Sequence, residues 1–180
     1  MIRLFFASVL FLSSLFAFSL DSPQEKVVFH FHKKPKLEIK KRNYDGDKFV
    51  NKSFKGYEFR DVVFKNVTFD RVDFTSTRFT NTKFYKCKFK EVDFRNSMIV
   101  SSIFRSCEIN YSFFESLGIY NSLFLSSKFL SSSFRGSRLQ NTRFTRTILT
   151  GTIWTNGKQC KKGSIGKCKL AKKKKFILKF

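Results

Sequence analysis

Large apolar residues recur at every fifth position through the middle of this 180-residue chain. The series runs without a gap from Phe54 to Trp154, over 21 positions that hold fifteen Phe, five Ile or Leu and the single Trp. Of the Phe residues in this stretch, only Phe113 lies out of phase. An α-helix repeats every 3.6 residues and a strand every two, so neither explains a spacing of five.

A second inward position accompanies the first. The residue two places before each large residue is Val, Thr, Cys or Ser from Val62 to Thr152, and Leu117 is the one exception. One large and one small buried residue per five predict a chain that turns continually. Such a chain buries its apolar surface only by stacking coil on coil, which is the architecture of a solenoid.

Units such as Val-Asp-Phe-Thr-Ser at 72–76 and Val-Asp-Phe-Arg-Asn at 92–96 follow a small–acidic–aromatic pattern with two free positions. The sequence resembles the pentapeptide-repeat family over about residues 49–154. The resemblance implies an all-β, right-handed quadrilateral β-helix of about five coils, in which residues 20 apart stack. The chain departs from the family pattern at the second position, which often holds Lys, Arg, Ile, Leu or Met.

The N-terminus has the pattern of a signal peptide. A basic residue, Arg3, precedes an apolar run, and Ala17 and Ser19 are the small residues of a cleavage site, so we expect cleavage after Ser19. The run is short for a transmembrane helix, which needs about 20 residues. We therefore expect an exported protein, periplasmic or secreted; an uncleaved anchor is the alternative.

The expected organisation has four parts: a signal peptide at 1–19, an N-terminal linker or capping segment at 20–48, the β-helix at 49–154, and a C-terminal cap with a basic tail at 155–180. His30 and His32 would share one face of a strand in the second part, but two His alone are a weak metal signal.

The two C-terminal cysteines lie in a Trp-x-x-Gly-x-x-Cys run that continues to Gly-Ser-x-Gly-x-Cys. This run looks like the ending of other exported pentapeptide-repeat proteins, and the resemblance favours a Cys160–Cys168 disulfide. The last coil of a solenoid exposes its core and edge, which a disulfide-closed cap can cover. A zinc site is the alternative, but it needs four ligands and only two Cys are near.

Cys87 and Cys107 are 20 residues apart and both occupy the small inward position. Neighbouring coils bring them within the range of a disulfide. We expect two buried thiols, since free Cys is common in cores, and a bridge stays open as the alternative.

The charge is strongly one-sided. The chain has 36 Lys and Arg against 13 Asp and Glu, and no acidic residue follows Glu115. A strongly positive charge favours binding to nucleic acid, lipopolysaccharide or an anionic membrane surface. The alternative is that these charges only keep the surface solvated. The candidate polyanion-binding residues are Arg135, Arg138, Arg143, Arg146, Lys172, Lys173, Lys174 and Lys175.

Outward positions of two successive coils carry an apolar cluster. Stacking at 20 residues would place Val100 beside Tyr120 and Ile103 beside Leu123. A contiguous apolar patch often marks an interface, here with a protein partner or in a homodimer. Coverage by the N-terminal segment, or scattered surface residues, are the alternatives. The candidate interface residues are Met98, Val100, Ile103, Tyr120, Leu123 and Leu125.

The repeat region offers no catalytic constellation. It contains no His, no nucleophile–base set, no Gly-rich phosphate loop and no acidic metal cluster, so we expect neither an enzyme nor a cofactor. Some members of the resembled family protect DNA gyrase by imitating DNA, which requires a negative rod in the cytoplasm. A net charge of +23 and an export signal argue against gyrase. The leading hypothesis is an exported binding or scaffolding protein of the cell envelope; the alternative is a polyanion or membrane-surface binder.

Overall fold

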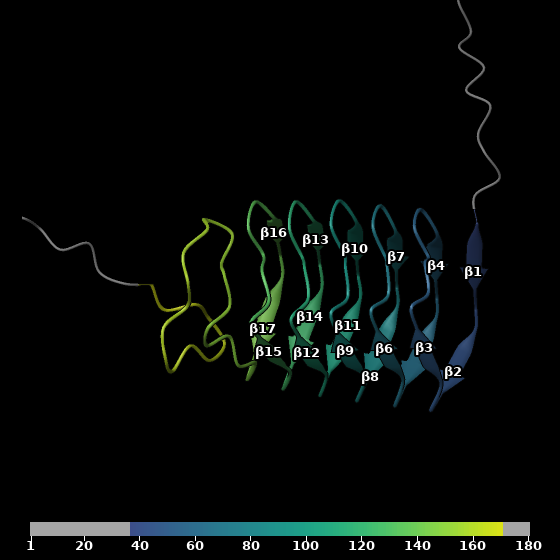
Figure 1. Cartoon of the computed structure of the whole chain (residues 1–180), viewed down its shortest axis with the longest axis horizontal. Helices are drawn as coiled ribbons and strands as arrows, with labels where there is room; N and C mark the ends of the chain where they lie inside the picture. Colours follow the sequence, from purple (N-terminus) through teal and green to yellow (C-terminus); the bar gives the residue numbers. More distant parts are fainter. Residues whose placement is uncertain (1–36, 171–180) are drawn as a thin grey trace, which may run out of the picture. The chain divides into compact units, whose positions relative to one another are not determined.

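The computed structural model describes residues 37–170, in which every regular element is a three-residue β-strand. The strands form three parallel sheets (Figure 1). The first sheet contains β1 (Glu38–Lys40), β4 (Glu58–Arg60), β7 (Arg78–Thr80), β10 (Met98–Val100), β13 (Gly118–Tyr120) and β16 (Arg138–Gln140). The second contains β2 (Asn43–Asp45), β5 (Val63–Lys65), β8 (Lys83–Tyr85), β11 (Ile103–Arg105), β14 (Leu123–Leu125) and β17 (Arg143–Thr145). The third contains β3 (Lys48–Val50), β6 (Thr68–Asp70), β9 (Lys88–Lys90), β12 (Glu108–Asn110) and β15 (Lys128–Leu130).

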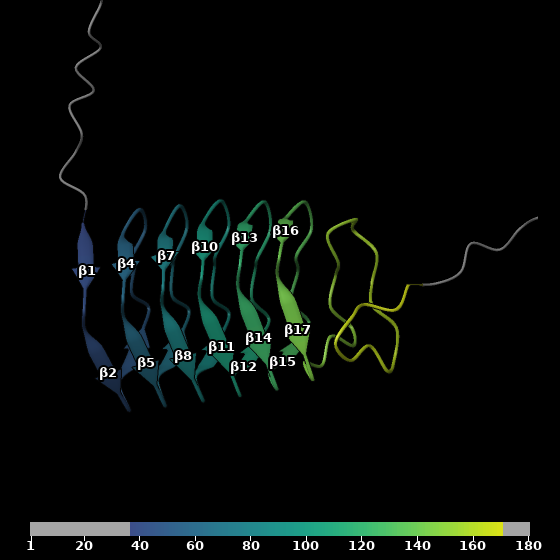
Figure 2. The same cartoon turned by 180° about the vertical axis from the view of Figure 1, so that it is seen from behind.

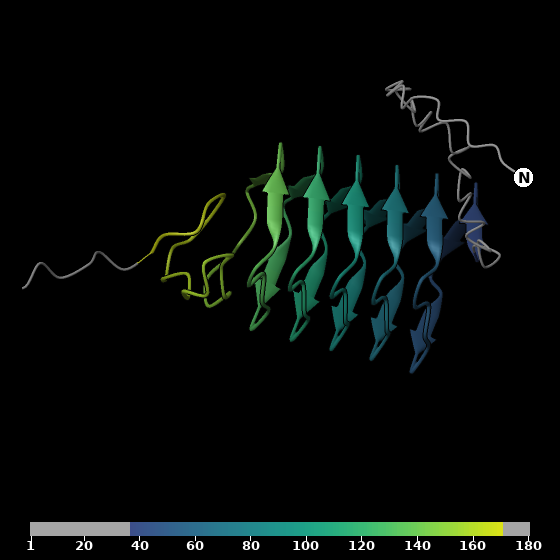
Figure 3. The same ribbon diagram turned by 90° about the horizontal axis from the view of Figure 1, so that it is seen from above.

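Each coil takes 20 residues. Strands pair with the strand three places later in the chain, as in the register Ile99↔Ile119, so every sheet neighbour comes from the next coil (Figure 3). The fourth side has no strand and is joined by single parallel bridges such as Asp73↔Asp93. The prediction of a right-handed quadrilateral β-helix of about five turns is confirmed.

The corners explain why no strand exceeds three residues. Every fifth residue from Lys41 to Gly151 has a positive φ, between 48° and 81°. A left-handed residue turns the chain sharply, at a cost of roughly 1–2 kcal/mol for a residue with a Cβ. Hydrogen bonds between coils offset this cost, because the corner N–H of Asn81 donates to the carbonyl of Val100 at 3.0 Å, and other corners repeat the bond.

The large inward residues stack in columns along the solenoid and meet edge to face around each coil. The Phe84 and Phe104 rings stack at 4.4 Å between centroids, while Phe64 and Phe69 meet at 5.3 Å and 75°. Both arrangements suit the quadrupole of an aromatic ring. Most of these rings are fully buried, and each contributes roughly 1.5–3 kcal/mol of transfer free energy.

Small inward residues fit between the columns and bond to the backbone. The Thr77 hydroxyl donates to the carbonyl of Phe54 at 2.8 Å, and the Ser112 hydroxyl accepts the N–H of Val92 at 3.2 Å. A larger side chain has little room here, which is why the position is restricted to small residues. Leu117 is buried as well, next to the column of Ile99 and Ile119, where Ile replaces the bulkier Phe.

The solenoid begins earlier than the sequence suggested. The first coil starts at Glu38, whereas residues up to 48 were expected to form a linker or cap. Tyr44 continues the five-residue phase and its ring stacks on Phe64 at 5.0 Å. The small position of this coil holds the exposed Arg42 and Asp47, so the pattern is incomplete. The expected signal peptide, His30 and His32 lie outside the described residues.

A cap covers part of the C-terminal end, seen beyond β16 and β17 in Figure 2. The expected Cys160–Cys168 disulfide is present, with its Cα atoms 5.1 Å apart. Antiparallel bridges join Ile148 to Ile165 and Ile153 to Gln159, so the cap covers the third and fourth sides of the last coil.

Candidate binding surfaces

The six predicted interface residues come together on two adjacent sheets, and we call them the central patch. The patch consists of Met98, Val100, Ile103, Tyr120, Leu123 and Leu125, from β10, β11, β13 and β14. Val100 pairs with Tyr120 and Ile103 with Leu123 in the ladders. All six side chains are half-buried, because neighbouring coils are only about 4.8 Å apart.

Gly118 shapes one side of the central patch. It is the ladder partner of Met98 and lacks a side chain. A Cβ at this position would lie 2.7 Å from the Tyr120 ring, so that ring lies over the glycine. The missing Cβ lets Tyr120 lie flat along β13 and keeps this part of the patch level.

Polar residues flank the central patch along the solenoid. On the N-terminal side its columns continue to Arg78, Thr80 and Lys83, and on the C-terminal side to Arg138 and Arg143. The patch is thus an apolar area between polar rims, and its ladders hold it rigid.

The basic residues predicted for polyanion binding spread around the last coil. Arg135 lies on the fourth side, Arg138 on β16, Arg143 on β17 and Arg146 at the next corner, and all four are exposed. The last acidic residue of the sequence, Glu115, lies one coil before Arg135, and its carboxylate accepts the Ser133 hydroxyl at 2.8 Å. Residues 172–175, the lysines of the same prediction, lie outside the described range.

A second exposed cluster was not singled out as a site by the sequence analysis. Tyr111 and Phe113 are 50% and 46% exposed, and with Arg71 and Glu91 they line a hollow of about 580 Å³. The Arg95 guanidinium lies 5.7 Å from the centroid of the Phe113 ring. The out-of-phase position of Phe113 was the signal that its ring points outward.

Asp93 holds Arg95 in place beside that ring. Its carboxylate accepts hydrogen bonds from the backbone N–H and the Nε of Arg95, each at 2.9 Å. The side-chain hydrogen bond to Asp93, together with the negative charge of Asp93, raises the pKa of Arg95 above its ordinary value. Tyr111 also occupies a left-handed corner with φ 53°, a conformation that is uncommon for a bulky residue.

Cys87 and Cys107 are free, buried thiols in neighbouring coils, in line with the expectation. Burial raises the pKa of the Cys107 thiol strongly. A buried thiol of raised pKa is a poor nucleophile, so Cys107 contributes packing rather than chemistry.

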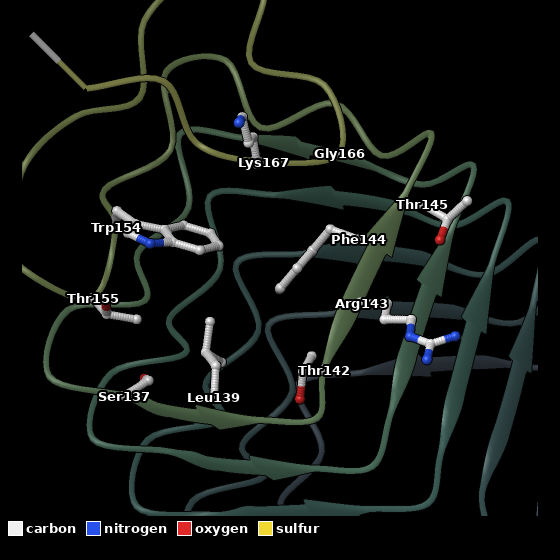
Figure 4. Close-up of a pocket in the computed structure, with 10 residues that line it drawn as sticks. All are labelled: Ser137, Leu139, Thr142, Arg143, Phe144, Thr145, Trp154, Thr155, Gly166 and Lys167. Carbon is white, nitrogen blue, oxygen red and sulfur yellow. The ribbon is translucent and has the colours of Figure 1, made fainter.

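The end of the solenoid is only partly covered by the cap. A cavity of about 660 Å³ lies over the last coil (Figure 4). Leu139, Phe144 and Trp154 point into it, and Gly166 and Lys167 of the cap pass along its edge. The Trp154 ring contacts Phe144 at 5.4 Å between centroids. This cavity exposes the end of the aromatic core.

Metal and membrane features are absent from residues 37–170. This range contains no group of three or more His, Cys, Asp or Glu side chains that could hold a metal ion. It also contains no helix with the length and apolar character needed to cross a bilayer.

Comparison with known proteins identifies the repeat. The family model described as "Pentapeptide repeat region" matches residues 38–114. No curated protein matches the chain by sequence.

Several solved structures are similar in fold. QnrB1, a plasmid-mediated fluoroquinolone resistance protein, is 15% identical with a TM-score of 0.35, covering 65% of this chain and 78% of its own. Rfr23 from the cyanobacterium Cyanothece 51142 is 10% identical with a TM-score of 0.41, covering 64% and 82%. A thylakoid-lumen protein of Arabidopsis thaliana is 10% identical with a TM-score of 0.30, covering 62% and 67%. Residues 38–114 are therefore a pentapeptide-repeat region, and the five-residue period of the sequence continues from it to Trp154.

Proposed function

We propose that the protein is an exported, non-catalytic binding or scaffolding protein that presents its central patch to a protein partner. The observation that carries the proposal is the composition of the outer columns. The columns through Val100 and Ile103 are apolar in two successive coils and polar in the coils on either side, while Leu125 pairs with Arg105. An apolar centre with a polar rim is the usual composition of a protein interface.

Rigidity supports a binding role. Each patch residue belongs to a strand held by coils on both sides, so little conformational entropy remains to be lost on association. The described residues contain no metal-ligand cluster, and the repeat region contains no His. A pre-formed face without catalytic groups suits docking rather than turnover.

Charge insertion tests the central patch. We expect Met98→Lys combined with Leu123→Lys to abolish any dimer in a sedimentation-velocity concentration series. The matched control is Thr68→Lys with Asn110→Lys, which adds the same charge to β6 and β12 of the third sheet. Circular dichroism of both variants verifies that they fold.

A site-specific photo-crosslinker distinguishes a foreign partner from a second copy. Placed at Val100 in the producing cell, it should yield a discrete crosslinked species; at Asn110 it should not. A monomer in sedimentation together with no crosslink at Val100 would refute the proposed interface.

Export is part of the proposal. If the signal is cleaved after Ser19, N-terminal sequencing of the protein recovered outside the cytoplasm will start at Leu20. Recovery of the intact chain from the cytoplasm would reject export while leaving the binding face untouched.

A second candidate function is polyanion or anionic-membrane binding through the basic end. The exposed arginines of the last coil all follow Glu115, the last acidic residue of the sequence, and the planar guanidinium suits phosphate. We expect binding to DNA or to phosphatidylglycerol vesicles that falls steeply with salt and weakens without residues 171–180. The truncated variant should keep every residue up to 170, because Lys169 bonds to Lys161 and Ser164 within the cap. No binding at physiological salt would exclude this function.

A further inference from the structure

Two half-exposed aromatic residues break the repeat pattern at one place on the surface. Among the described residues with positive φ, Tyr111 is the only aromatic one, and the other corners hold Asn, Ser, Gly or a charged residue. Phe113, two residues later, belongs to a column of the fourth side that otherwise carries Ser, Asp and Ile. Departures from local rules that bury nothing are expected at functional positions.

Folding alone gives no reason for a Tyr at this corner. The left-handed conformation is harder for a bulky residue than for Asn, which occupies the equivalent corners at Asn81 and Asn121. The Tyr111 hydroxyl has no hydrogen-bond partner among the described residues. The Tyr111 N–H donates to the carbonyl of Leu130 at 2.9 Å, and the Leu130 side chain is exposed as well. The apolar surface therefore extends into the next coil.

The two rings form one wall of the hollow of about 580 Å³, and Arg71 and Glu91 form the rest of its lining. Arg71, Glu91 and Tyr111 are corners of three successive coils, so they lie in one column beside Phe113. Small-molecule sites have volumes of about 300–1,000 Å³, with mostly apolar walls and a few convergent polar groups. The hollow has this composition: an aromatic wall, one guanidinium donor and one carboxylate acceptor.

Contacts outside the hollow hold its walls in place. The Nε of Arg71 donates to the side-chain oxygen of Asn51 at 2.7 Å. Arg95, whose Nε donates to Asp93 at 2.9 Å, lies over the Phe113 ring in a cation–π contact. Side chains that are already ordered lose little conformational entropy when a ligand binds.

The charges at the hollow are balanced, although the chain as a whole carries +23. Three ion pairs border it, which are Arg71–Asp70, Lys90–Glu91 and Arg95–Asp93. A balanced set of charges gives little net attraction to an anion or to a cation, so this site favours a neutral ligand. In this respect the hollow differs from the basic end of the solenoid.

We propose that this hollow binds a neutral saccharide. The C–H face of a pyranose ring packs against the rings of Tyr111 and Phe113, because C–H hydrogens carry a partial positive charge and the aromatic face is negative. Sugar hydroxyls donate to the Glu91 carboxylate and accept from the Arg71 guanidinium, in charge-assisted hydrogen bonds.

Two other ligand classes use aromatic surfaces and fit the hollow less well. Proline-rich peptides dock on aromatic grooves, but a prolyl residue has no N–H to donate to the Glu91 carboxylate. Single-stranded nucleic acid stacks on aromatic rings within a positively charged groove, whereas the charges here are balanced. The site follows β12 on the third and fourth sides, so it does not depend on the function proposed for the central patch.

Saturation-transfer NMR on the whole purified chain tests the proposal. The probes are cellohexaose, chitohexaose and maltohexaose, and decaproline and oligo(dT) serve as comparisons. Irradiation of the aromatic protein protons should transfer to the ring C–H protons of at least one saccharide and saturate on titration. No transfer to any of the three saccharides would overturn the proposal. Transfer to decaproline or oligo(dT) alone would assign the hollow to a peptide or a nucleic acid, against the proposal.

Tyr111→Asn separates binding from folding. Asn suits a left-handed corner, so this variant should unfold at the same or a higher denaturant concentration. It should nevertheless bind the saccharide at least about tenfold more weakly, because the ring is gone. The matched control is Tyr85→Asn, which removes a half-buried Tyr from β8 on the second sheet and should change the affinity by less than about twofold. Unchanged affinity of Tyr111→Asn would overturn the proposal.

A second variant tests the polar side of the hollow. Glu91→Gln keeps the shape of the side chain but replaces a charged acceptor by a neutral one, so it should weaken binding about fivefold. Glu108→Gln on β12 makes the same change outside the hollow and should leave the affinity within about twofold. Equal effects of the two substitutions would contradict a direct contact between Glu91 and the sugar.

Salt and the variant of the central patch complete the test. Binding of a neutral ligand should change by less than about twofold between about 0.05 M and about 0.5 M salt. A steep fall with salt would show that charge attraction drives binding, against the proposal. Met98→Lys with Leu123→Lys should leave saccharide binding unchanged, so the failure of one proposed surface is distinguishable from the failure of the other.

Discussion

The two halves of the solenoid fill the same inward positions with different chemistry. From Phe54 to Phe94 the large position is always Phe, and the small position is mostly Val or Thr. Beyond residue 96, Ile or Leu replaces Phe at several of the large positions, and the small position is mostly Ser. Every ion pair found in the described range also lies between Glu38 and Arg95.

The serines of the second half compensate for its thinner hydrocarbon core. Each accepts a backbone N–H from the coil before, as Ser127 does from Cys107 at 3.1 Å, and most donate to a carbonyl. The difference teaches that the fold fixes the size of the inward side chain and leaves its polarity free, provided that a polar atom finds a partner.

Breaking an aromatic column should have the largest effect. Phe104 lies between Phe84 and Phe124 and is fully buried. We expect Phe104→Ala to lower the free energy of unfolding by about 3–5 kcal/mol, against about 0.5–1.5 kcal/mol for Ile109→Val in the next column. Chemical denaturation measures both, and a cost below about 1 kcal/mol for Phe104→Ala would contradict its assignment to a tightly packed column.

Removing one hydroxyl tests the second half directly. Ser112→Ala leaves the buried N–H of Val92 without its acceptor, so we expect a loss of about 1–3 kcal/mol. Ser112→Thr keeps the hydroxyl, and Thr already occupies this position at Thr77 and Thr82, so it should retain most of the stability. If the two variants unfold at the same denaturant concentration, the hydroxyl contributes only its volume.

Acid should loosen the coils around Asp73, by a few tenths of a kcal/mol, because this carboxylate is partly exposed. Burial pushes the pKa of Asp73 upward, but hydrogen bonds from Thr75 and Ser53 and the charge of Lys55 hold it below its ordinary value. A carboxyl with a lowered folded-state pKa stabilises above its unfolded pKa, and this stabilisation is lost as the pH falls through the folded value.

Hydrogen exchange between pH 5 and pH 2.5 resolves this effect by coil. After correction for intrinsic rates, amides near Asp73 should lose protection, and those beyond residue 116 should not. Asp73→Asn should remove the local pH dependence. Uniform loss along the solenoid would point to overall charge repulsion instead.

The core columns could be predicted from the sequence because large apolar residues occupy the same position of every five-residue unit, and that position must face inward. The central patch followed from the same register, since residues 20 apart stack. The first coil was missed because its small positions hold Arg42 and Asp47, which are exposed and charged. The half-open C-terminal cavity had no sequence signal, because the side that a cap covers depends on how residues 156–168 fold back.

The chain turns at a left-handed corner every five residues from Lys41 to Gly151. The number of residues between two surfaces therefore sets the angle between the directions in which they face. Five residues added between the central patch and the last coil would keep every Phe inward but rotate everything downstream by a quarter turn. An insertion of twenty residues would add one complete coil, so the downstream part would face its original direction again. The direction in which the basic end faces relative to the patch is therefore set by a whole number of pentapeptides, and it can be re-aimed without altering a residue in either surface.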